Sequence, residues 1–224
     1  MNSHTNNRSR GFTLIELLVV IAIIGILAGM LLAIGGRANQ KMAIARAKTE
    51  LDKVALAINA YQAKMGHFPP DNPNIADPNH PWANPLYYEL IGCRPIPGGF
   101  GTLDSASAVT AADLALVGAS GIVNSASGQG DDAGASQSFH KDVKPGHFGY
   151  LPPQATPVVR VLGVSVRGPV MTPISSLASE INPYRYNSST PTNNTTTFDL
   201  WVDITVGKKT YRINNWRSTP DILP

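Results

Sequence analysis

A long, uninterrupted run of apolar residues lies near the start of the chain. Residues 12–34 contain one charged side chain, Glu16, and one hydroxyl, Thr13. As an α-helix rising about 1.5 Å per residue, this run is roughly 35 Å long, which is enough to cross a hydrocarbon core of ~30 Å. The pattern therefore predicts a membrane-spanning helix over residues 12–34.

The residues before this run are polar and basic. Residues 1–11 carry Arg8 and Arg10 and contain no acidic residue. An ordinary secretory signal has an apolar region of about 7 to 15 residues followed by a small-residue cleavage site, and the run here is longer and has no such region after it. Because the positive charges precede the span, we expect a cytoplasmic N-terminus and an exported C-terminal part.

A narrower apolar stripe follows in residues 35–66. Its members recur every three or four residues, as one face of a helix requires: Ile44, Ala47, Leu51, Val54, Ile58, Tyr61 and Met65. Charged residues occupy the other faces, and Gly66 with Pro69 and Pro70 marks the end of the helix. We predict an amphipathic helix that continues the membrane helix and covers a sheet of the same chain. A coiled-coil dimer is the alternative interpretation of this spacing.

Residues 67–224 are predicted to form the exported globular part. A short helix is expected at 85–91, and a glycine- and serine-rich loop region at about 98–147, with helical turns near 111–117 and a flexible loop at 128–136. Alternating β-branched residues predict strands at 158–166, 198–206 and 210–216, with Gly207-Lys208 as a hairpin turn. The predicted fold class is α+β, with one long helix packed on a small antiparallel sheet.

Composition narrows the class of protein further. Only 15% of residues are charged, and there are 20 glycines and 18 prolines, which suits a loop-rich exported protein. A single cysteine excludes an internal disulfide and any multi-cysteine metal site. Without the two leader arginines, 16 basic residues face 15 acidic ones, so charge argues against a nucleic-acid partner.

The segment from Arg10 to Ile21, RGFTLIELLVVI, closely resembles the prepilin leader and helix start shared by type IV pilins and type II secretion pseudopilins. The resemblance implies a pilin-like fold and a prepilin peptidase that cuts between Gly11 and Phe12 and methylates the new amine of Phe12. It also implies an assembly role for Glu16, whose carboxylate would pair with the N-terminal ammonium of a neighbouring subunit in the apolar interior of a filament.

The C-terminal stretches 182–186, 198–201 and 213–216 are similar to major pseudopilins of type II secretion, in which an acidic loop binds calcium. Here Thr205 to Thr210 occupies that place, with two lysines and no acid. Asp199, Asp203 and Asn214 are the remaining candidate oxygen ligands, but calcium takes six to eight oxygens with several carboxylates. We therefore predict no cofactor and interpret these residues as polar strand ends.

Catalytic signals are weak in this sequence. Four histidines, at positions 67, 80, 140 and 147, form no helical metal pair, and we expect them to be solvated in loops. Asn187-Ser188-Ser189 and Asn194-Thr195-Thr196 match glycosylation acceptors, although a polar strand connection explains them as well. Trp201 and Trp216 are expected to pack within the hairpin. We predict that the protein is not an enzyme.

The predicted function is that of a structural subunit, a pseudopilin or minor pilin, which polymerises through its N-terminal helix. Its expected partners are the prepilin peptidase, other pilin-like subunits, the assembly machinery of the bacterial inner membrane and the lipid bilayer. The expected location is the inner membrane, crossed once, with an exported C-terminal domain and an assembled filament. A membrane-anchored periplasmic binding domain is one alternative. A DNA-uptake pilin is another, which would use Lys208, Lys209, Arg212 and Arg217.

Overall fold

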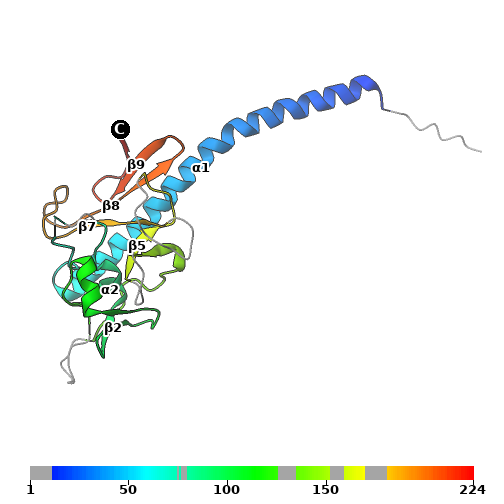
Figure 1. The fold of residues 1–224 in the computed structure, drawn as a ribbon. Helices are drawn as coiled ribbons and strands as arrows, with labels where there is room; N and C mark the ends of the chain where they lie inside the picture. Colours follow the sequence, from blue (N-terminus) through cyan, green and yellow to red (C-terminus); the bar gives the residue numbers. More distant parts are fainter. Residues whose placement is uncertain (1–11, 75, 77–79, 126–134, 152–158, 170–180) are drawn as a thin grey trace, which may run out of the picture. The chain divides into compact units, whose positions relative to one another are not determined.

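The computed structural model describes residues 12–74, 76, 80–125, 135–151, 159–169 and 181–224, and within the first of these ranges it leaves the side chains of residues 31–37 undescribed. The chain divides into two compact units, residues 1–42 and residues 43–224 (Figure 1). Helix α1, Leu14–Met65, contributes residues to both. The predicted leader, residues 1–11, and the predicted loop 128–136, except for its last two residues, lie outside the described residues.

The C-terminal part of α1 provides one wall of the core of the second unit. Five members of the predicted stripe are buried, and Ile44 and Met65 pack against them at the ends: Ala47, Leu51, Val54, Ile58 and Tyr61. The helix ends where expected, because Gly66 takes a φ of 82°, in the left-handed region that suits glycine. Burial of the stripe inside its own unit confirms the interpretation of a helix covering a sheet rather than forming a coiled coil.

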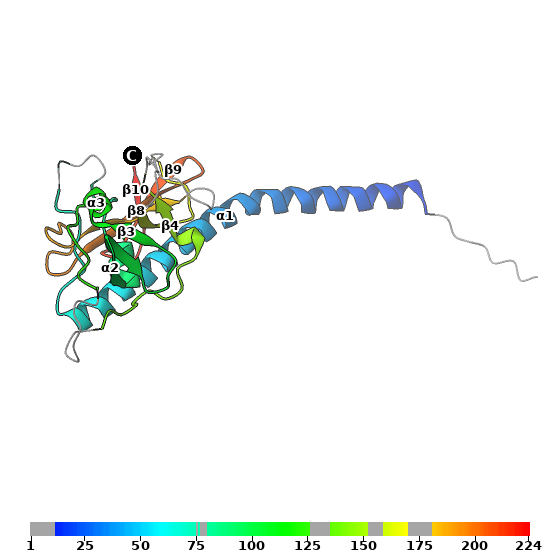
Figure 2. The same ribbon diagram turned by 60° about the horizontal axis from the view of Figure 1, so that its bottom comes forward.

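The sheet against this helix has four antiparallel strands in the order β10-β9-β8-β7. They are β7 (Arg185–Asn187), β8 (Asp199–Val206), β9 (Lys209–Asn214) and β10 (Asp221–Leu223). In both ribbon views β8 and β9 lie beside the C-terminal half of α1 (Figure 1, Figure 2). Leu200, Val202 and Ile204 alternate along β8 and are fully buried, as expected for a strand with one face on the core.

The predicted hairpin is confirmed. Val206 pairs with Lys209, so Gly207 and Lys208 form a two-residue turn, and Gly207 has a φ of 65°. Asn214 pairs with Trp201 at the far end of the ladder. The pattern of residues 217–224 did not predict β10, because this strand has only three residues and follows a proline.

A second sheet has the order β4-β5-β6, with strands β4 (Phe148–Tyr150), β5 (Arg160–Val164) and β6 (Asn182–Pro183). A short 3-10 turn, η2 (Pro145–His147), precedes β4. The strand predicted at 158–166 corresponds to β5, and position 158 lies outside the described residues.

Residues 93–110 differ from the sequence prediction. The N-terminal part of the predicted loop region belongs to a meander of three antiparallel strands, β1 (Cys93–Ile96), β2 (Gly99–Thr102) and β3 (Ala108–Thr110). Glycine here serves close packing, since a Cβ on Gly99 would lie 2.1 Å from the carbonyl oxygen of Val109 on the paired strand. The composition of this segment therefore predicted a loop, whereas pairing with neighbouring strands makes it part of a sheet.

The predicted short helices are confirmed. Helix α2 (Leu86–Ile91) is buried along its whole length. Helix α3 (Ala111–Leu114) and the 3-10 helix η1 (Ala115–Val117) follow β3, with Thr110 and Asp113 forming a capping box. Together these elements make the second unit α+β, as predicted.

Candidate assembly and processing site

The start of α1 is held by a reciprocal set of hydrogen bonds between Thr13 and Glu16. The backbone N–H and the hydroxyl of Thr13 donate to Glu16 Oε2 at 2.8 and 2.7 Å, and the backbone N–H of Glu16 donates back to Thr13 Oγ1 at 3.3 Å. This is the arrangement of a capping box, in which two otherwise unpaired helix-start donors are satisfied. Glu16 is thus positioned by its own helix.

The second carboxylate oxygen of this residue is free. Within the described part of the chain, Glu16 Oε1 accepts no hydrogen bond, and the side chain is exposed. An exposed carboxylate oxygen next to a capped helix start can accept a further donor without breaking the cap. The two residues of the predicted cleavage site are Gly11 and Phe12. Phe12 is 81% exposed, whereas Gly11 lies outside the described residues.

The surroundings of Glu16 are apolar. Phe12, Ile15, Val19 and Val20 line a shallow pocket together with Glu16. From position 12 to position 30 the helix exposes large apolar side chains on all sides. A surface of this extent marks an interaction site with lipid or protein.

Among the described residues, no helix has a stretch that is both long and apolar enough to cross a membrane. Positions 31–34 of the predicted span have side chains outside the described set.

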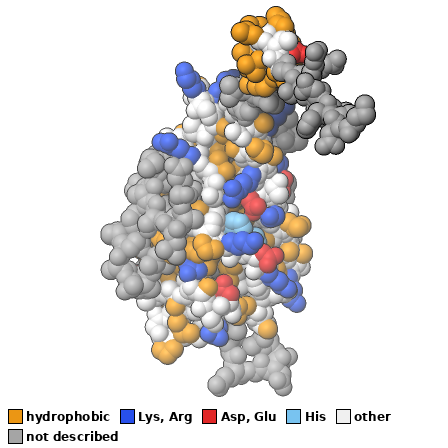
Figure 3. All heavy atoms as spheres, turned by 90° about the vertical axis from the view of Figure 1, so that its right-hand side faces the viewer, with side chains coloured by type: hydrophobic (Ala, Val, Ile, Leu, Met, Phe, Trp, Pro, Cys, Tyr) orange, Lys and Arg blue, Asp and Glu red, His pale blue; other side chains and the backbone are white. Residues whose placement is uncertain are grey.

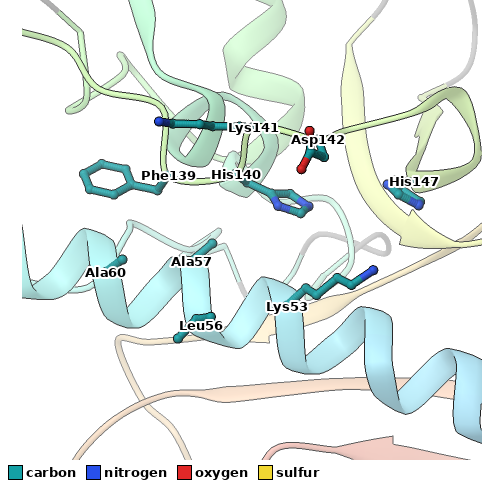
Figure 4. A pocket seen from close by; sticks show the side chains of 9 residues that line it. All are labelled: Lys53, Leu56, Ala57, Ala60, Phe139, His140, Lys141, Asp142 and His147. Atoms are coloured by element: carbon teal, nitrogen blue, oxygen red, sulfur yellow. The ribbon is translucent and has the colours of Figure 1, made fainter.

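A groove lies in the second unit between α1 and the segment before β4. Lys53, Leu56 and Ala60 of α1 line a pocket of about 420 Å³ together with Phe139 to Asp142 and His147 (Figure 4). Basic, acidic and histidine side chains gather on the face of the second unit shown in Figure 3. The groove therefore combines charged side chains with apolar side chains of α1.

His140 and His147, expected to be solvated, are instead partly buried in this groove because α1 packs against their segment. Burial lowers the pKa of His140, and the neighbouring His147 lowers it further. His147 Nε2 lies 3.6 Å from Glu50 Oε2. Within the described ranges, no three His, Cys, Asp or Glu side chains gather so as to hold a metal ion.

The three candidate calcium ligands are engaged separately. Asp199 accepts backbone N–H bonds from residues 192–194, and Asp203 forms a bidentate ion pair with Arg212 at 2.7 and 2.9 Å. Asn214 Oδ1 accepts the N–H groups of Trp216 and Arg217. Asp199 and Asp203 lie four residues apart on one strand, about 13 Å, so they cannot share one ion.

The tryptophans behave as expected, with the rings of Trp201 and Trp216 in an edge-to-face contact at 5.9 Å. Sequence reasoning missed Glu89, a fully buried carboxylate on α2. The signal that could have revealed it is a single acid inside the apolar run LYYELI, where a charged residue needs partners.

Residues 6–32 match the family model described as Prokaryotic N-terminal methylation motif. The match covers residues 6–11 of the predicted leader, the expected cleavage position and the start of α1, and it indicates a type IV pilin-like protein that is processed as a prepilin. It also implies processing by a prepilin peptidase and assembly with other pilin subunits. No curated protein and no solved structure matches the chain.

Proposed function

We propose that this chain is a structural subunit that is cut between Gly11 and Phe12, methylated on the new amine of Phe12, and polymerised through α1 into a pilin-like filament. Both a type II secretion pseudopilus and a surface pilus fit the proposal. In the precursor, residues 12–34 cross the inner membrane once, with the second unit exported.

The observation that carries this proposal is the state of Glu16. Its carboxylate is anchored by Thr13 through one oxygen and lies among exposed apolar side chains, and its other oxygen accepts no hydrogen bond from any described residue. In an apolar environment a lone carboxylate is costly, so it requires a cationic partner. The ammonium of a neighbouring mature chain is such a partner, because it too would be desolvated in the filament interior.

A simple membrane anchor does not account for this arrangement. An anchor needs an apolar helix and flanking charges, and the cap that Glu16 forms with Thr13 uses only one of the two carboxylate oxygens. An anchor does not need the glycine-phenylalanine junction within a matched methylation motif. A structural role is also favoured over catalysis, since the matched motif is one of N-terminal methylation, which the resemblance to type IV pilins links to filament assembly.

Two of the four basic residues on which the DNA-uptake alternative depends are already paired with carboxylates. Of the four basic residues proposed for it, Arg212 is paired with Asp203 and Arg217 with Asp221. The remaining two, Lys208 and Lys209, lie at the hairpin turn. Two lysines supply little of the extended positive surface that polyanion binding requires.

The test is the intact mass and N-terminal sequence of the protein purified from membranes. We expect a mature chain that begins at N-methylated Phe12, and we expect Gly11→Val to leave the full-length, unmethylated precursor. Ser9→Val serves as a matched control in the leader and should be cut normally. A wild-type chain that keeps Met1, or that begins near residue 35, would contradict the proposal.

A further inference from the structure

We infer that the loop between β7 and β8 is a site of O-linked glycosylation, with the hydroxyls of Thr195, Thr196 and Thr197 as sugar acceptors. This inference goes beyond filament assembly and does not depend on how the N-terminal segment is processed. It rests on which hydroxyls of the loop form hydrogen bonds within the protein and which are exposed to solvent without one.

The loop has an unusual composition. Seven of the eleven residues 187–197 are serine or threonine, Pro191 interrupts them, and none is charged. Segments rich in serine and threonine with proline are typical of O-glycosylated regions. Here the segment is an exposed connection in a folded unit, so its side chains are presented on a surface.

Two buried carboxylates hold the backbone of this loop. Asp71 Oδ2 accepts the N–H groups of Ser188 and Ser189 at 2.8 and 2.9 Å. Asp199 accepts the N–H groups of residues 192, 193 and 194 at 2.8 to 2.9 Å. Burial raises the pKa of Asp199, but these donors outweigh it and lower the pKa overall, so the carboxylate stays ionised and keeps its donors.

Some of the loop hydroxyls are used internally. Ser188 Oγ donates to the carbonyl of Pro69, and Ser189 Oγ donates to Asp71. Thr192 Oγ1 donates to Asp199. These three hydroxyls help to fix the loop and are poor candidates for modification, because a substituent would displace a hydrogen bond.

The hydroxyls of Thr195, Thr196 and Thr197 form no hydrogen bond within the described part of the chain, and all three residues are exposed. The N–H of Thr197 donates to the carbonyl of Asn194 at 2.9 Å, so Thr195 and Thr196 occupy the two central positions of a tight turn. An acceptor at the tip of an anchored turn is accessible to an enzyme without unfolding the domain.

The asparagines of the same loop are committed elsewhere. Asn187 Nδ2 donates to the carbonyl of Thr190 at 3.0 Å, and Asn194 Nδ2 donates to the carbonyl of Phe198 at 3.0 Å. N-linked transfer would require each amide nitrogen to leave its carbonyl partner. The structure therefore favours the threonine hydroxyls over the two asparagine acceptors in the sequence.

The reaction is a glycosyl transfer from an activated sugar diphosphate, carried by a nucleotide or a lipid, on an external transferase. The threonine Oγ1 attacks the anomeric carbon, a new C–O bond forms, and the bond from that carbon to the diphosphate oxygen breaks. The hydroxyl proton passes to a base of the transferase, and the diphosphate leaves. No oxidation or reduction takes place.

The experiment uses the full-length protein purified from its native cells. Trypsin releases the peptide of residues 186–208, and fragmentation by electron transfer locates any sugar on it. We expect added sugar mass on residues 195–197, and we expect alkaline β-elimination to convert the modified threonine to 2-aminobut-2-enoic acid. The triple variant T195V/T196V/T197V should lose the added mass, whereas T195S/T196S/T197S, which keeps the hydroxyls, should retain it.

Equal thermal unfolding of the two triple variants would show that the loop still folds, as expected for hydroxyls without internal bonds. An unmodified wild-type peptide would overturn the inference. So would sugar on Asn187 or Asn194, or added mass that persists in the valine variant.

Discussion

The phenolic hydroxyl of Tyr61 donates a hydrogen bond of 3.0 Å to the carboxylate of Glu89, and both residues are fully buried. The same carboxylate accepts the backbone N–H groups of Val123 and Asn124 at 2.8 and 2.9 Å. One buried charge therefore joins α1, α2 and the segment that follows η1. The first two predictions follow from this contact.

Replacing Tyr61 with phenylalanine should lower the free energy of unfolding by about 1–3 kcal/mol, because it removes a donor from a buried carboxylate. The ring remains, and with it the packing against His67 and Phe139. Chemical denaturation of the detergent-solubilised full chain measures the change. Tyr211→Phe, in which the hydroxyl has no hydrogen bond among the described residues, is the control and should change the stability little. Equal losses in the two variants would remove this role for the Tyr61–Glu89 bond.

Glu89 should make stability depend on pH in a defined direction. Burial raises the pKa of Glu89 above its ordinary value of 4.5, although its three donors oppose the increase. Between pH 4.5 and the raised pKa the folded state binds more protons than the unfolded state, so the contribution of this group to stability falls as the pH rises. Glu89→Gln cannot ionise and should remove this part of the slope. Parallel curves for wild type and variant between pH 4 and 8 would contradict the assignment.

Leu51 and Leu56 lie on the same helix but in opposite environments. Leu51 is 0% exposed in the core, whereas Leu56 is 70% exposed. Leu51→Asp should destabilise the second unit by about 3 kcal/mol or more, because an unpaired carboxylate enters an apolar contact. Leu56→Asp is the matched control and should cost less than about 0.5 kcal/mol. Similar melting temperatures for the two variants would show that the stripe does not hold the core.

Arg185 and Arg212 make a second matched pair, on the outer face of the sheet. Arg185 Nη1 is buried without a hydrogen-bond partner among the described residues, and burial lowers the pKa of Arg185. Arg185→Met should leave the stability unchanged or raise it by about 1 kcal/mol. Arg212→Met breaks the bidentate pair with Asp203 and should lower the free energy of unfolding by about 1–2 kcal/mol. This loss is smaller than that expected for a fully buried pair, because Arg212 is partly exposed. A large loss in the Arg185 variant would mean that this guanidinium has a stabilising partner.

Thr13 and Glu16 can be separated by two substitutions. Glu16→Ala removes the carboxylate and should still be inserted and cut after Gly11, yet it should fail to enter filaments sheared from cells. Thr13→Val removes the capping hydroxyl but keeps the carboxylate, so this variant should still polymerise. Expression should be matched and the cut confirmed by mass. Normal polymerisation of the Glu16 variant would leave this carboxylate with only its role in the helix cap.

Local signals in the sequence determined several parts of this protein. The stripe from Ile44 to Met65 repeats with the period of a helix, and Gly207-Lys208 sits between two alternating runs, so neither depended on distant contacts. The methylation motif is likewise contiguous, from residue 6 to residue 32. The bond between Thr13 and Glu16 spans three residues and belongs to the same local class.

Tertiary structure alone decided the remaining features. Gly99 belongs to a glycine-rich stretch whose composition is typical of a loop. It lies in a strand because the neighbouring strand approaches too closely for any side chain at this position. Glu89 gains its donors from residues 28 to 35 positions away in the chain. In the loop between β7 and β8, the hydroxyls of Ser188 and Ser189 donate to Pro69 and Asp71, more than 100 residues distant. Periodicity reports which face of an element is apolar, but pairing between distant segments depends on how the chain packs, and no local pattern encodes it.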